Sequence, residues 1–278
     1  MIIRELDAEG IDIELELLLQ AIYLRYQFDF RQYVRAPMAK RLKRLMPRFG
    51  VENFSQLQER LLVCPEIFPT ILNCLTVPTT EFFRDYQYFL ALRNQVFPFL
   101  LDTQAINIWI PGCSTGEEVF SIAIFLKEAH LLERVTLYAT DINPNYLNLA
   151  RQGVFDNYIV EKATHAYLKA GGQKSLNDYF TRYYDNVQFD LDLIKNAVFY
   201  DHNVAIDDVI EEMNFVSMRN VLSFFNRKLQ DLTLGKIKEA LTIGGFLGLG
   251  EKESLSSSYH QHWFSKLPFA ENLYQRTG

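Results

Sequence analysis

Short apolar runs alternate with helical stretches from about residue 105 onward, and this alternation restricts the fold more than any other feature of the sequence. The apolar runs have the length of buried strands, and the segments between them repeat apolar residues at helical spacing. Such an order is typical of an open, mostly parallel sheet with helices packed on it. We therefore predict an α/β fold with a doubly wound sheet. The predicted strands are Ile106–Ile110, Val135–Ala139, Phe215–Met218 and Phe246–Leu249, and the predicted helices are Glu117–His130 and Pro144–Arg151.

The first 76 residues follow a different pattern, because apolar residues recur at helical spacing throughout and no glycine falls between Gly10 and Gly50. We predict an all-α N-terminal domain over 1–76 and the α/β domain over 77–278. Residues 179–200 are polar and aromatic, with strand-like alternation from Val187 to Leu191. They predict a small antiparallel β-subdomain inserted in the larger domain.

Composition excludes several classes of protein. The chain is 49% hydrophobic and 22% charged, as a globular protein is. No apolar run reaches the ~20 residues of a membrane helix, and the first ten residues carry acids where a signal peptide is basic. These features predict a cytoplasmic protein without membrane insertion. The net charge of −6 argues against general nucleic-acid binding, and the three cysteines and five histidines show no spacing for a metal site.

One basic segment stands out from this acidic average. Residues 31–50 hold seven basic residues and no acid, and on a helical wheel the basic side chains separate from the apolar ones. The basic side chains form an arc that is either the solvated face of an ordinary amphipathic helix or a docking face for an acidic partner. The apolar arc is Val34, Met38, Leu42, Leu45 and Met46, and the basic arc is Lys40, Arg41, Lys43, Arg44 and Arg48.

Candidate ligand-binding residues follow three of the predicted strands, where ligands bind in open α/β sheets. The three segments are Gly112–Glu118, Asp141 and Arg219-Asn220. The first loop matches neither the dinucleotide-binding glycine motif nor a P-loop. It also leads into Glu117 and Glu118, which repel a diphosphate at a helix N-terminus.

This loop therefore suits a cationic ligand or a nucleoside without phosphates. S-adenosylmethionine is both, since it carries a sulfonium and an ammonium and lacks phosphate. Asp141, at the end of a strand, is suited to accept charge-assisted hydrogen bonds from both ribose hydroxyls.

Four motifs together resemble one known family. The segments TTEFFRD (79–85), GCSTGEE (112–118), ATDIN (139–143) and RNVL (219–222) are similar to those of the chemotaxis receptor methyltransferases, the CheR family. The resemblance covers most of the chain. It implies a Rossmann-like S-adenosylmethionine-dependent methyltransferase domain after the all-α domain. The implied activity is protein-glutamate O-methylation of chemoreceptor cytoplasmic regions in chemotaxis adaptation, with S-adenosylhomocysteine as product.

The resemblance also implies roles for individual residues. Thr80 and Arg84 would face the cofactor, with Arg84 beside the transferred methyl group as the catalytic residue. Glu118 would bind the ammonium of the amino-acid moiety and Asp141 the ribose. The basic arc would meet the receptor's methylation region. The full cofactor-binding set is Thr80, Arg84, Gly112, Glu118, Asp141, Ile142, Asn203, Val204, Arg219 and Asn220.

A glutamate acceptor is consistent with these residue types. Its reference pKa is ~4.3, so the nucleophile is ionised at neutral pH and needs no general base. The enzyme must mainly desolvate the carboxylate and hold it in line with the methyl group. Arg84 is suited to hold it with a forked hydrogen bond. The alternative for Arg84 is a surface ion pair with Asp85.

The sequence departs from the family pattern at three places: Val119 and Phe120 follow GEE where the family has Pro and Tyr, and the other two departures keep alternatives open. Pro78 stands where the family commonly has Asn, and Phe224 where it has a Tyr near the methyl group, which removes a hydrogen-bonding group. An S-adenosylmethionine-binding regulatory protein with weak or no catalysis, or a methyltransferase for another acidic protein, therefore remains an alternative. Tyr179–Asn196 lacks the glycine-containing extension of family members that bind a receptor's C-terminal pentapeptide, which predicts docking without the pentapeptide.

Overall fold

The computed structural model describes residues 3–210, 212–256, 258–268 and 272–278. Residues 1 and 2, which the predicted all-α domain includes, lie outside this range. The chain forms two compact units. The smaller unit contains Met1–Val77 and Phe224–Leu229, and the larger unit contains Pro78–Ser223 and Gln230–Gly278.

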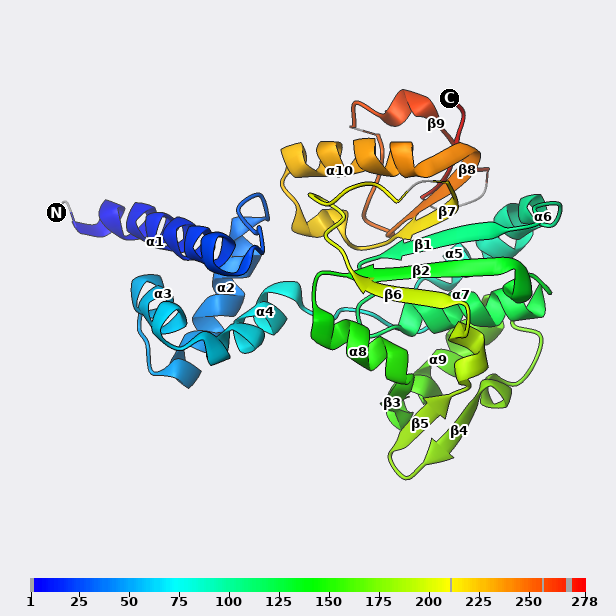
Figure 1. Cartoon of the computed structure of the whole chain (residues 1–278), viewed down its shortest axis with the longest axis horizontal. Coiled ribbons are helices and arrows are strands. Elements are labelled where there is room, and N and C mark those ends of the chain that lie inside the picture. Colours follow the sequence, from blue (N-terminus) through cyan, green and yellow to red (C-terminus); the bar gives the residue numbers. More distant parts are fainter. Residues whose placement is uncertain (1–2, 211, 257, 269–271) are drawn as a thin grey trace. The chain divides into compact units, whose positions relative to one another are not determined.

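The smaller unit is helical, and α1 and α3 pack side by side within it (Figure 1). Glu14 of α1 accepts hydrogen bonds from the backbone N–H of Phe54 and the hydroxyl of Ser55, at the start of α3. Near the other end the Tyr26 hydroxyl donates to the Leu61 carbonyl. The helices are α1 (Ile3–Tyr26), α2 (Arg35–Leu45), α3 (Phe54–Val63) and α4 (Phe68–Thr76), with 3₁₀ turns η1 (Met46–Phe49) and η2 (Pro65–Ile67).

The basic segment departs from the regular helix assumed for it. Helix α2 ends at Leu45 and a 3₁₀ turn containing Pro47 follows, because proline has no N–H to continue the helix. Val34 precedes α2 with an extended backbone and is 38% exposed, so its place on the apolar arc of a helix was wrong. Arg41 is half-buried, and it donates from Nε and Nη2 to the carbonyls of Cys74 and Leu75 at 3.0 and 3.1 Å. The exposed basic residues are Lys40, Lys43, Arg44 and Arg48.

A short segment from far along the chain completes the smaller unit. Phe224–Leu229 belongs to it rather than to the α/β unit. The Val34 N–H donates to the Phe224 carbonyl at 2.8 Å, and the Asn226 N–H donates to the Gln32 carbonyl at 2.9 Å. Tyr33 and Phe225 form a β-bridge between these bonds. The chain therefore leaves the α/β unit and returns to it within six residues.

The larger unit is built on a seven-stranded sheet in the order β6-β2-β1-β7-β8-β10-β9. The first five strands in this order are parallel, and β10 pairs antiparallel with β8 and with β9. The predicted doubly wound, mostly parallel sheet is confirmed. The strands are β1 (Ile106–Pro111), β2 (Val135–Asp141), β6 (Ala197–Asp201), β7 (Met213–Met218), β8 (Leu241–Leu249), β9 (Phe264–Lys266) and β10 (Leu273–Arg276).

Helices pack against this sheet, and α7 is its most deeply buried helix. It ends at Glu128, two residues before the predicted end, because His130 takes a left-handed backbone conformation with φ 57°.

None of the described helices is both long and apolar enough to cross a membrane. The helices are α5 (Tyr86–Ala91), the π-helical turn η3 (Leu92–Val96), α6 (Phe97–Leu100), α7 (Glu117–Glu128), α8 (Pro144–Gln152), α9 (Asn157–Lys169) and α10 (Arg227–Ala240), with 3₁₀ turns η4 (Leu132–Arg134), η5 (Leu176–Tyr179), η6 (Leu191–Ile194), η7 (Leu222–Phe224) and η8 (Gln261–Trp263).

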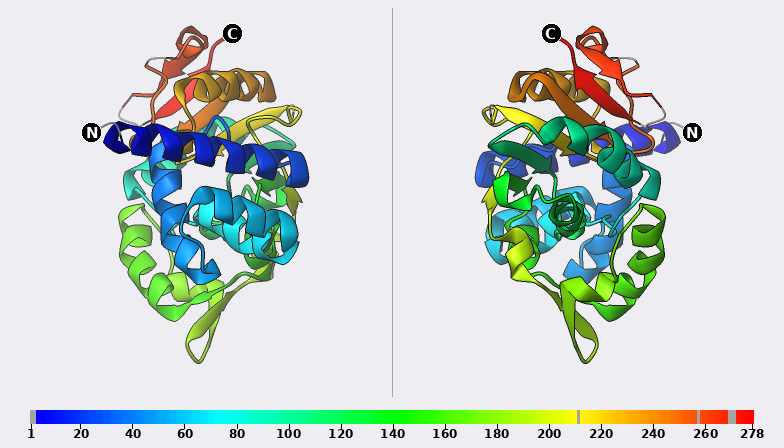
Figure 2. Two further views of the ribbon diagram at one scale, coloured as in Figure 1. Left: turned by 90° about the vertical axis from the view of Figure 1, so that its left-hand side faces the viewer. Right: turned by 90° about the vertical axis from the view of Figure 1, so that its right-hand side faces the viewer.

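A small antiparallel sheet of three strands, in the order β3-β5-β4, extends from the larger unit (Figure 2). The strands are β3 (Val154–Asp156), β4 (Phe180–Tyr183) and β5 (Asn186–Phe189). The predicted limits of the insertion, 179–200, were partly wrong. Ala197–Asp201 is β6, which pairs parallel with β2 at the edge of the main sheet, and β3 precedes the predicted range. An edge strand is only half covered, so its mixed polar and aromatic sequence resembled that of the hairpin.

Candidate functional site

Three loops meet where the central strands β2, β1 and β7 end. The chain runs from β1 to β2 and β6 on one side of the sheet, and from β7 to β8 on the other. The boundary between β1 and β7 is therefore the topological switch point at which such sheets bind ligands. The predicted segments Gly112–Glu118, Asp141 and Arg219-Asn220 lie at these three strand ends.

The loop after β1 depends on two glycines. Gly112 and Gly116 have φ values of 71° and 99°, which glycine adopts without steric cost. A Cβ on Gly112 would lie 2.7 Å from the Val221 side chain, and one on Gly116 would lie 2.9 Å from the Ala150 side chain. The Cys113 N–H donates to the Thr140 carbonyl at 2.9 Å and fixes the loop to the end of β2.

Asp141 ends β2 and is buried, with 7% of its surface exposed. Its Oδ2 accepts from the Ser114 N–H and its Oδ1 from the Asn143 N–H, both at 2.9 Å. Burial raises the pKa of Asp141 to about 6, and the nearby Asp201 adds to the rise, although the backbone hydrogen bonds oppose it. The carboxylate is therefore mostly ionised at neutral pH, and each oxygen keeps a second lone pair for a ligand.

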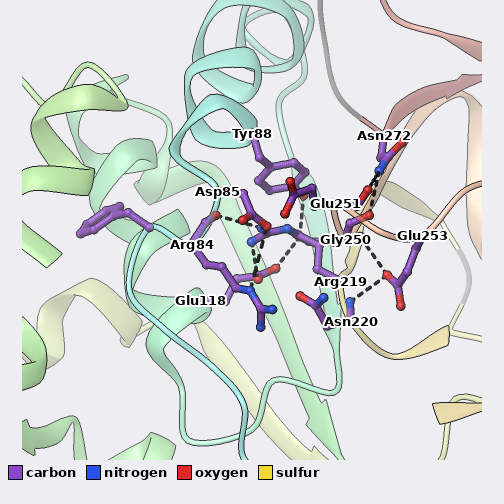
Figure 3. A network of polar contacts seen from close by, with 12 residues as sticks. Arg84, Asp85, Tyr88, Glu118, Arg219, Asn220, Gly250, Glu251, Glu253 and Asn272 are labelled. Carbon is purple, nitrogen blue, oxygen red and sulfur yellow. Dashed lines mark hydrogen bonds and ion pairs between the residues drawn. The ribbon is translucent and has the colours of Figure 1, made fainter. Parts of the chain in front are cut away.

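Arg219, which follows β7, is the centre of a buried ionic network (Figure 3). Its side chain is 1% exposed. Nη1 donates to Glu118 Oε2 at 2.9 Å, and Nη2 donates to Asp85 Oδ2 at 2.7 Å and to the Arg84 carbonyl at 2.8 Å. Burial alone would lower the pKa of Arg219, but the attraction of Glu118, Tyr88 and Asp85 outweighs it and raises the pKa. One cation thus holds two carboxylates, and it also holds the backbone of Arg84, the residue before one of them.

Glu118 lies in the first turn of α7 and reaches the same network. Its Oε1 accepts from the Ser217 hydroxyl at 2.6 Å, and its Oε2 accepts from Arg219. The side chain keeps 14% of its surface exposed. The sequence predicted Glu118 as a ligand for a cationic group, and the structure adds that both of its oxygens are fixed by the protein.

Arg84 is one-third exposed, with 32% of its side-chain surface accessible. Nη1 donates to the Thr79 carbonyl at 2.9 Å, whereas Nε is 4.0 Å from Asp85 Oδ2. Asp85 is closer to Arg219, so the surface ion pair considered as an alternative is a weak interaction. Thr80, three residues before Phe83, is half-buried.

The segment after β6 lies beside Asp141, because the His202 N–H donates to the Asp141 carbonyl at 3.3 Å. Val204 is buried, with 6% exposure. The Asn203 side chain accepts from the Ala205 N–H at 3.1 Å, and the Asn203 N–H donates to Asp207 Oδ2 at 2.7 Å. Ile142, the residue after Asp141, is half-buried.

Sequence reasoning missed Glu253, which holds the loop after β7. This buried carboxylate accepts from the N–H groups of Asn220, Ser223 and Gly250 at 2.8, 3.1 and 2.8 Å (Figure 3). Asn220 has a left-handed φ of 61°, a conformation that these bonds help to hold. Nothing in the sequence around residue 253 indicated a partner 33 residues earlier.

The residues present fit S-adenosylmethionine. Two carboxylates, Glu118 and Asp141, offer acceptors to an ammonium and to ribose hydroxyls, and residues 112–118 contain no basic side chain that a phosphate would need. Within the described residues, the Ser114 hydroxyl is buried without a hydrogen-bond partner beside Asp141. A polar ligand group at this position would satisfy it.

Comparisons with known proteins show which family the chain resembles. Residues 78–272 match the family model described as CheR methyltransferase, SAM binding domain, and residues 13–76 match CheR methyltransferase, all-alpha domain. A Pseudomonas putida protein, Cher3, named provisionally as a methyltransferase, is 44% identical over 96% of this chain and 97% of its own length. Chemotaxis protein methyltransferase 2 of Vibrio cholerae is 31% identical over 72% of each chain. The chemotaxis protein methyltransferase of Borreliella burgdorferi is 25% identical over 93% and 94%.

Proposed function

The chain belongs to the CheR methyltransferase family and is an S-adenosylmethionine-dependent methyltransferase, and we propose that its acceptor is a glutamate carboxylate in the cytoplasmic region of a chemoreceptor. Relatives named as chemotaxis protein methyltransferases support an acceptor of this kind. A protein with this acceptor works in the cytoplasm. The observation that carries the proposal is the position of a partly exposed arginine, Arg84, next to the buried carboxylate network.

Arg84 would bind the acceptor. The acceptor glutamate is ionised at neutral pH, so a fork of N–H donors can hold it without a proton transfer. S-adenosylmethionine, when bound, supplies a methyl group activated by a sulfonium. The Arg84 backbone carbonyl accepts from Arg219, which fixes the start of the side chain. Binding at this residue would exclude water from the carboxylate and align it for displacement.

The remaining residues of the site would bind and orient the cofactor. Glu118 would accept from its ammonium and Asp141 from its ribose hydroxyls, as the motifs imply. Asn203 and Val204 would lie near the adenine, since their segment is held beside Asp141. Thr80 would contribute a hydroxyl from the same segment as Arg84.

The exposed basic residues of segment 31–50 would contact the acidic partner. Lys40, Lys43, Arg44 and Arg48 form this basic face. Arg41 is left out of it, because its guanidinium is bound to the C-terminal carbonyls of α4. Charges of one sign on a surface speed encounter with a partner of the opposite sign and lose this effect at high salt.

Methyl transfer to a purified chemoreceptor cytoplasmic fragment tests the proposed function. The native protein is expected to transfer labelled methyl groups that alkali releases, as it releases esters. Arg84→Lys keeps the charge but loses the fork, so we expect kcat/KM to fall about 100-fold.

Arg151→Lys is the matched control, because Arg151 is an exposed arginine that donates to Asn148 and the Phe199 carbonyl. Within the described residues it makes no hydrogen bond or ion pair with Arg84 or the ionic network. Its activity is expected to stay within about twofold of the native protein. Alkali-stable label, or an Arg84→Lys protein as active as the control, would contradict the proposal.

We further infer that docking does not use a receptor C-terminal pentapeptide. The β4–β5 connection is a two-residue turn, Tyr184-Asp185, and residues 179–196 contain no glycine for the extension found in pentapeptide-binding family members. A receptor fragment with or without its last five residues is expected to be methylated at rates within about twofold. Calorimetric binding of the pentapeptide itself would contradict this inference.

A further inference from the structure

A chain of two buried hydroxyls, from Tyr88 of α5 and Ser217 of β7, leads to Glu118 at the start of α7. The Tyr88 hydroxyl lies 2.6 Å from the Ser217 hydroxyl, which in turn donates to Glu118 Oε1 at 2.6 Å. Tyr88 and Ser217 are 3% and 0% exposed. The two residues come from α5 and β7, so the contact joins elements that are 129 residues apart in the sequence.

The direction of these hydrogen bonds follows from the number of protons available. A serine hydroxyl has one proton, and Glu118 as a carboxylate can only accept. Ser217 therefore gives its proton to Glu118 and must accept from Tyr88. Burial raises the pKa of Tyr88 well above its ordinary value, so the phenol stays protonated and remains a donor. Hydrogen bonds in such a chain polarise and strengthen one another.

The Tyr88 ring is itself fixed by two further contacts. The Arg219 guanidinium carbon lies 4.2 Å from the ring centre, in a cation–π contact, and Figure 3 shows the ring above the ionic network. On the other side Gly248 of β8 leaves room for the hydroxyl, since a Cβ there would overlap it. Tyr88 therefore touches both groups that hold Glu118, Ser217 by its hydroxyl and Arg219 by its ring.

We propose that Tyr88 and Ser217 are positioning residues that fix the Glu118 carboxylate for the amino group of S-adenosylmethionine. The proposal rests on the role of Glu118 in the proposed function. Ser217 donates to Oε1 and Arg219 donates to Oε2, so the carboxylate is held in one rotational position. The lone pairs that remain for a ligand therefore keep a fixed orientation. A group oriented before binding loses less conformational freedom when the ligand arrives.

Two ligands separate positioning of Glu118 from general support of the fold. S-adenosylhomocysteine carries the amino-acid moiety, whereas 5′-methylthioadenosine keeps the nucleoside and the thioether and lacks that moiety. Calorimetric titration of both ligands into the full chain, with Ser217→Ala and Tyr88→Phe, is the experiment. We expect the affinity for S-adenosylhomocysteine to fall about tenfold in Ser217→Ala and about threefold in Tyr88→Phe, and the affinity for 5′-methylthioadenosine to stay within about twofold.

The double variant gives a second, independent readout. Because the Tyr88 hydroxyl acts only through Ser217, the double variant is expected to bind S-adenosylhomocysteine as weakly as Ser217→Ala alone. Tyr167→Phe is the matched control: this buried hydroxyl bonds Glu128, away from the strand ends, and its loss is expected to leave both affinities unchanged.

Equal losses for the two ligands, or no loss for S-adenosylhomocysteine, would overturn the proposal. Glu118→Gln distinguishes this failure from failure of the proposed cofactor contacts. If Glu118→Gln leaves S-adenosylhomocysteine affinity unchanged, the role of Glu118 itself is wrong. If Glu118→Gln weakens binding and neither Ser217→Ala nor Tyr88→Phe does, only the positioning role is wrong.

Discussion

Replacing Asp141 by alanine is expected to weaken S-adenosylhomocysteine binding by at least about 100-fold. Two charge-assisted hydrogen bonds to the ribose, at ~1.5–3 kcal/mol each, would be lost. The same carboxylate also fixes the Ser114 and Asn143 N–H groups, so the loop after β1 would lose an anchor. Calorimetry measures the affinity directly. Asp156→Ala is the control, because Asp156 also ends a strand, β3, but in the described structure its side chain accepts only from a local N–H, that of Tyr158. The Asp156→Ala protein is expected to bind S-adenosylhomocysteine normally.

The pH dependence of binding provides a second arm of this prediction. The pKa of Asp141 is raised from 3.8 to about 6, so the carboxylate loses its charge as the pH falls through about 6. At pH 5.5 roughly a quarter of the carboxyl groups are ionised, and the affinity is expected to be about fourfold lower than at pH 7.5. The same raised pKa makes the free energy of unfolding depend on pH in the opposite direction. The contribution of Asp141 to stability is present at low pH and is lost as the pH rises through about 6. A flat affinity profile in the native protein would contradict the role of Asp141.

Replacing Arg219 by methionine is expected to lower the free energy of unfolding of the larger unit by ~3–5 kcal/mol. The substitution keeps much of the volume but leaves Glu118 and Asp85 close to each other without their shared cation. It also removes the bond to the Arg84 carbonyl. Both tryptophans, Trp109 and Trp263, belong to the larger unit, so fluorescence during urea unfolding reports on it.

Arg182→Met serves as the control for this prediction. Arg182 pairs with Glu161 at 3.5 Å, and both side chains are largely exposed, at 43% and 59%. Exposed ion pairs contribute less than about 1 kcal/mol, so this variant is expected to unfold almost as the native protein does. If Arg219→Met behaved like Arg182→Met, the network would contribute no more than a surface ion pair.

Much of the fold and the chemistry could be predicted from the sequence, because the central strands and the binding residues are marked by short continuous sequence patterns. Strands β1, β2 and β7 lie inside the sheet, so they appear as apolar runs with a clear start and end. Ligand-binding residues follow directly after these runs, as the parallel arrangement requires. The four motifs identified the family, and the comparisons confirm the family, the cofactor and the class of enzyme.

The errors concern residues whose environment depends on distant partners. Residues 197–200 were assigned to the small sheet, but they belong to β6, whose partner is β2, about 60 residues earlier in the chain. Arg41 was placed on the basic arc, among the residues expected to meet an acidic partner, but its guanidinium reaches the end of α4. No sequence pattern around Glu253 or Ser217 indicated a role for them. Their hydrogen-bond partners are distant in the sequence and become neighbours only in the folded chain.

The segment Phe224–Leu229 has a consequence for engineering this molecule. Because the smaller unit takes this segment from the distal part of the chain, the polypeptide passes between the two units three times. Cutting after residue 77 would give a C-terminal fragment in which Phe225 has lost Tyr33. A chimera that exchanges the smaller unit between relatives must therefore transplant two discontinuous stretches together, the N-terminal helices and these six residues.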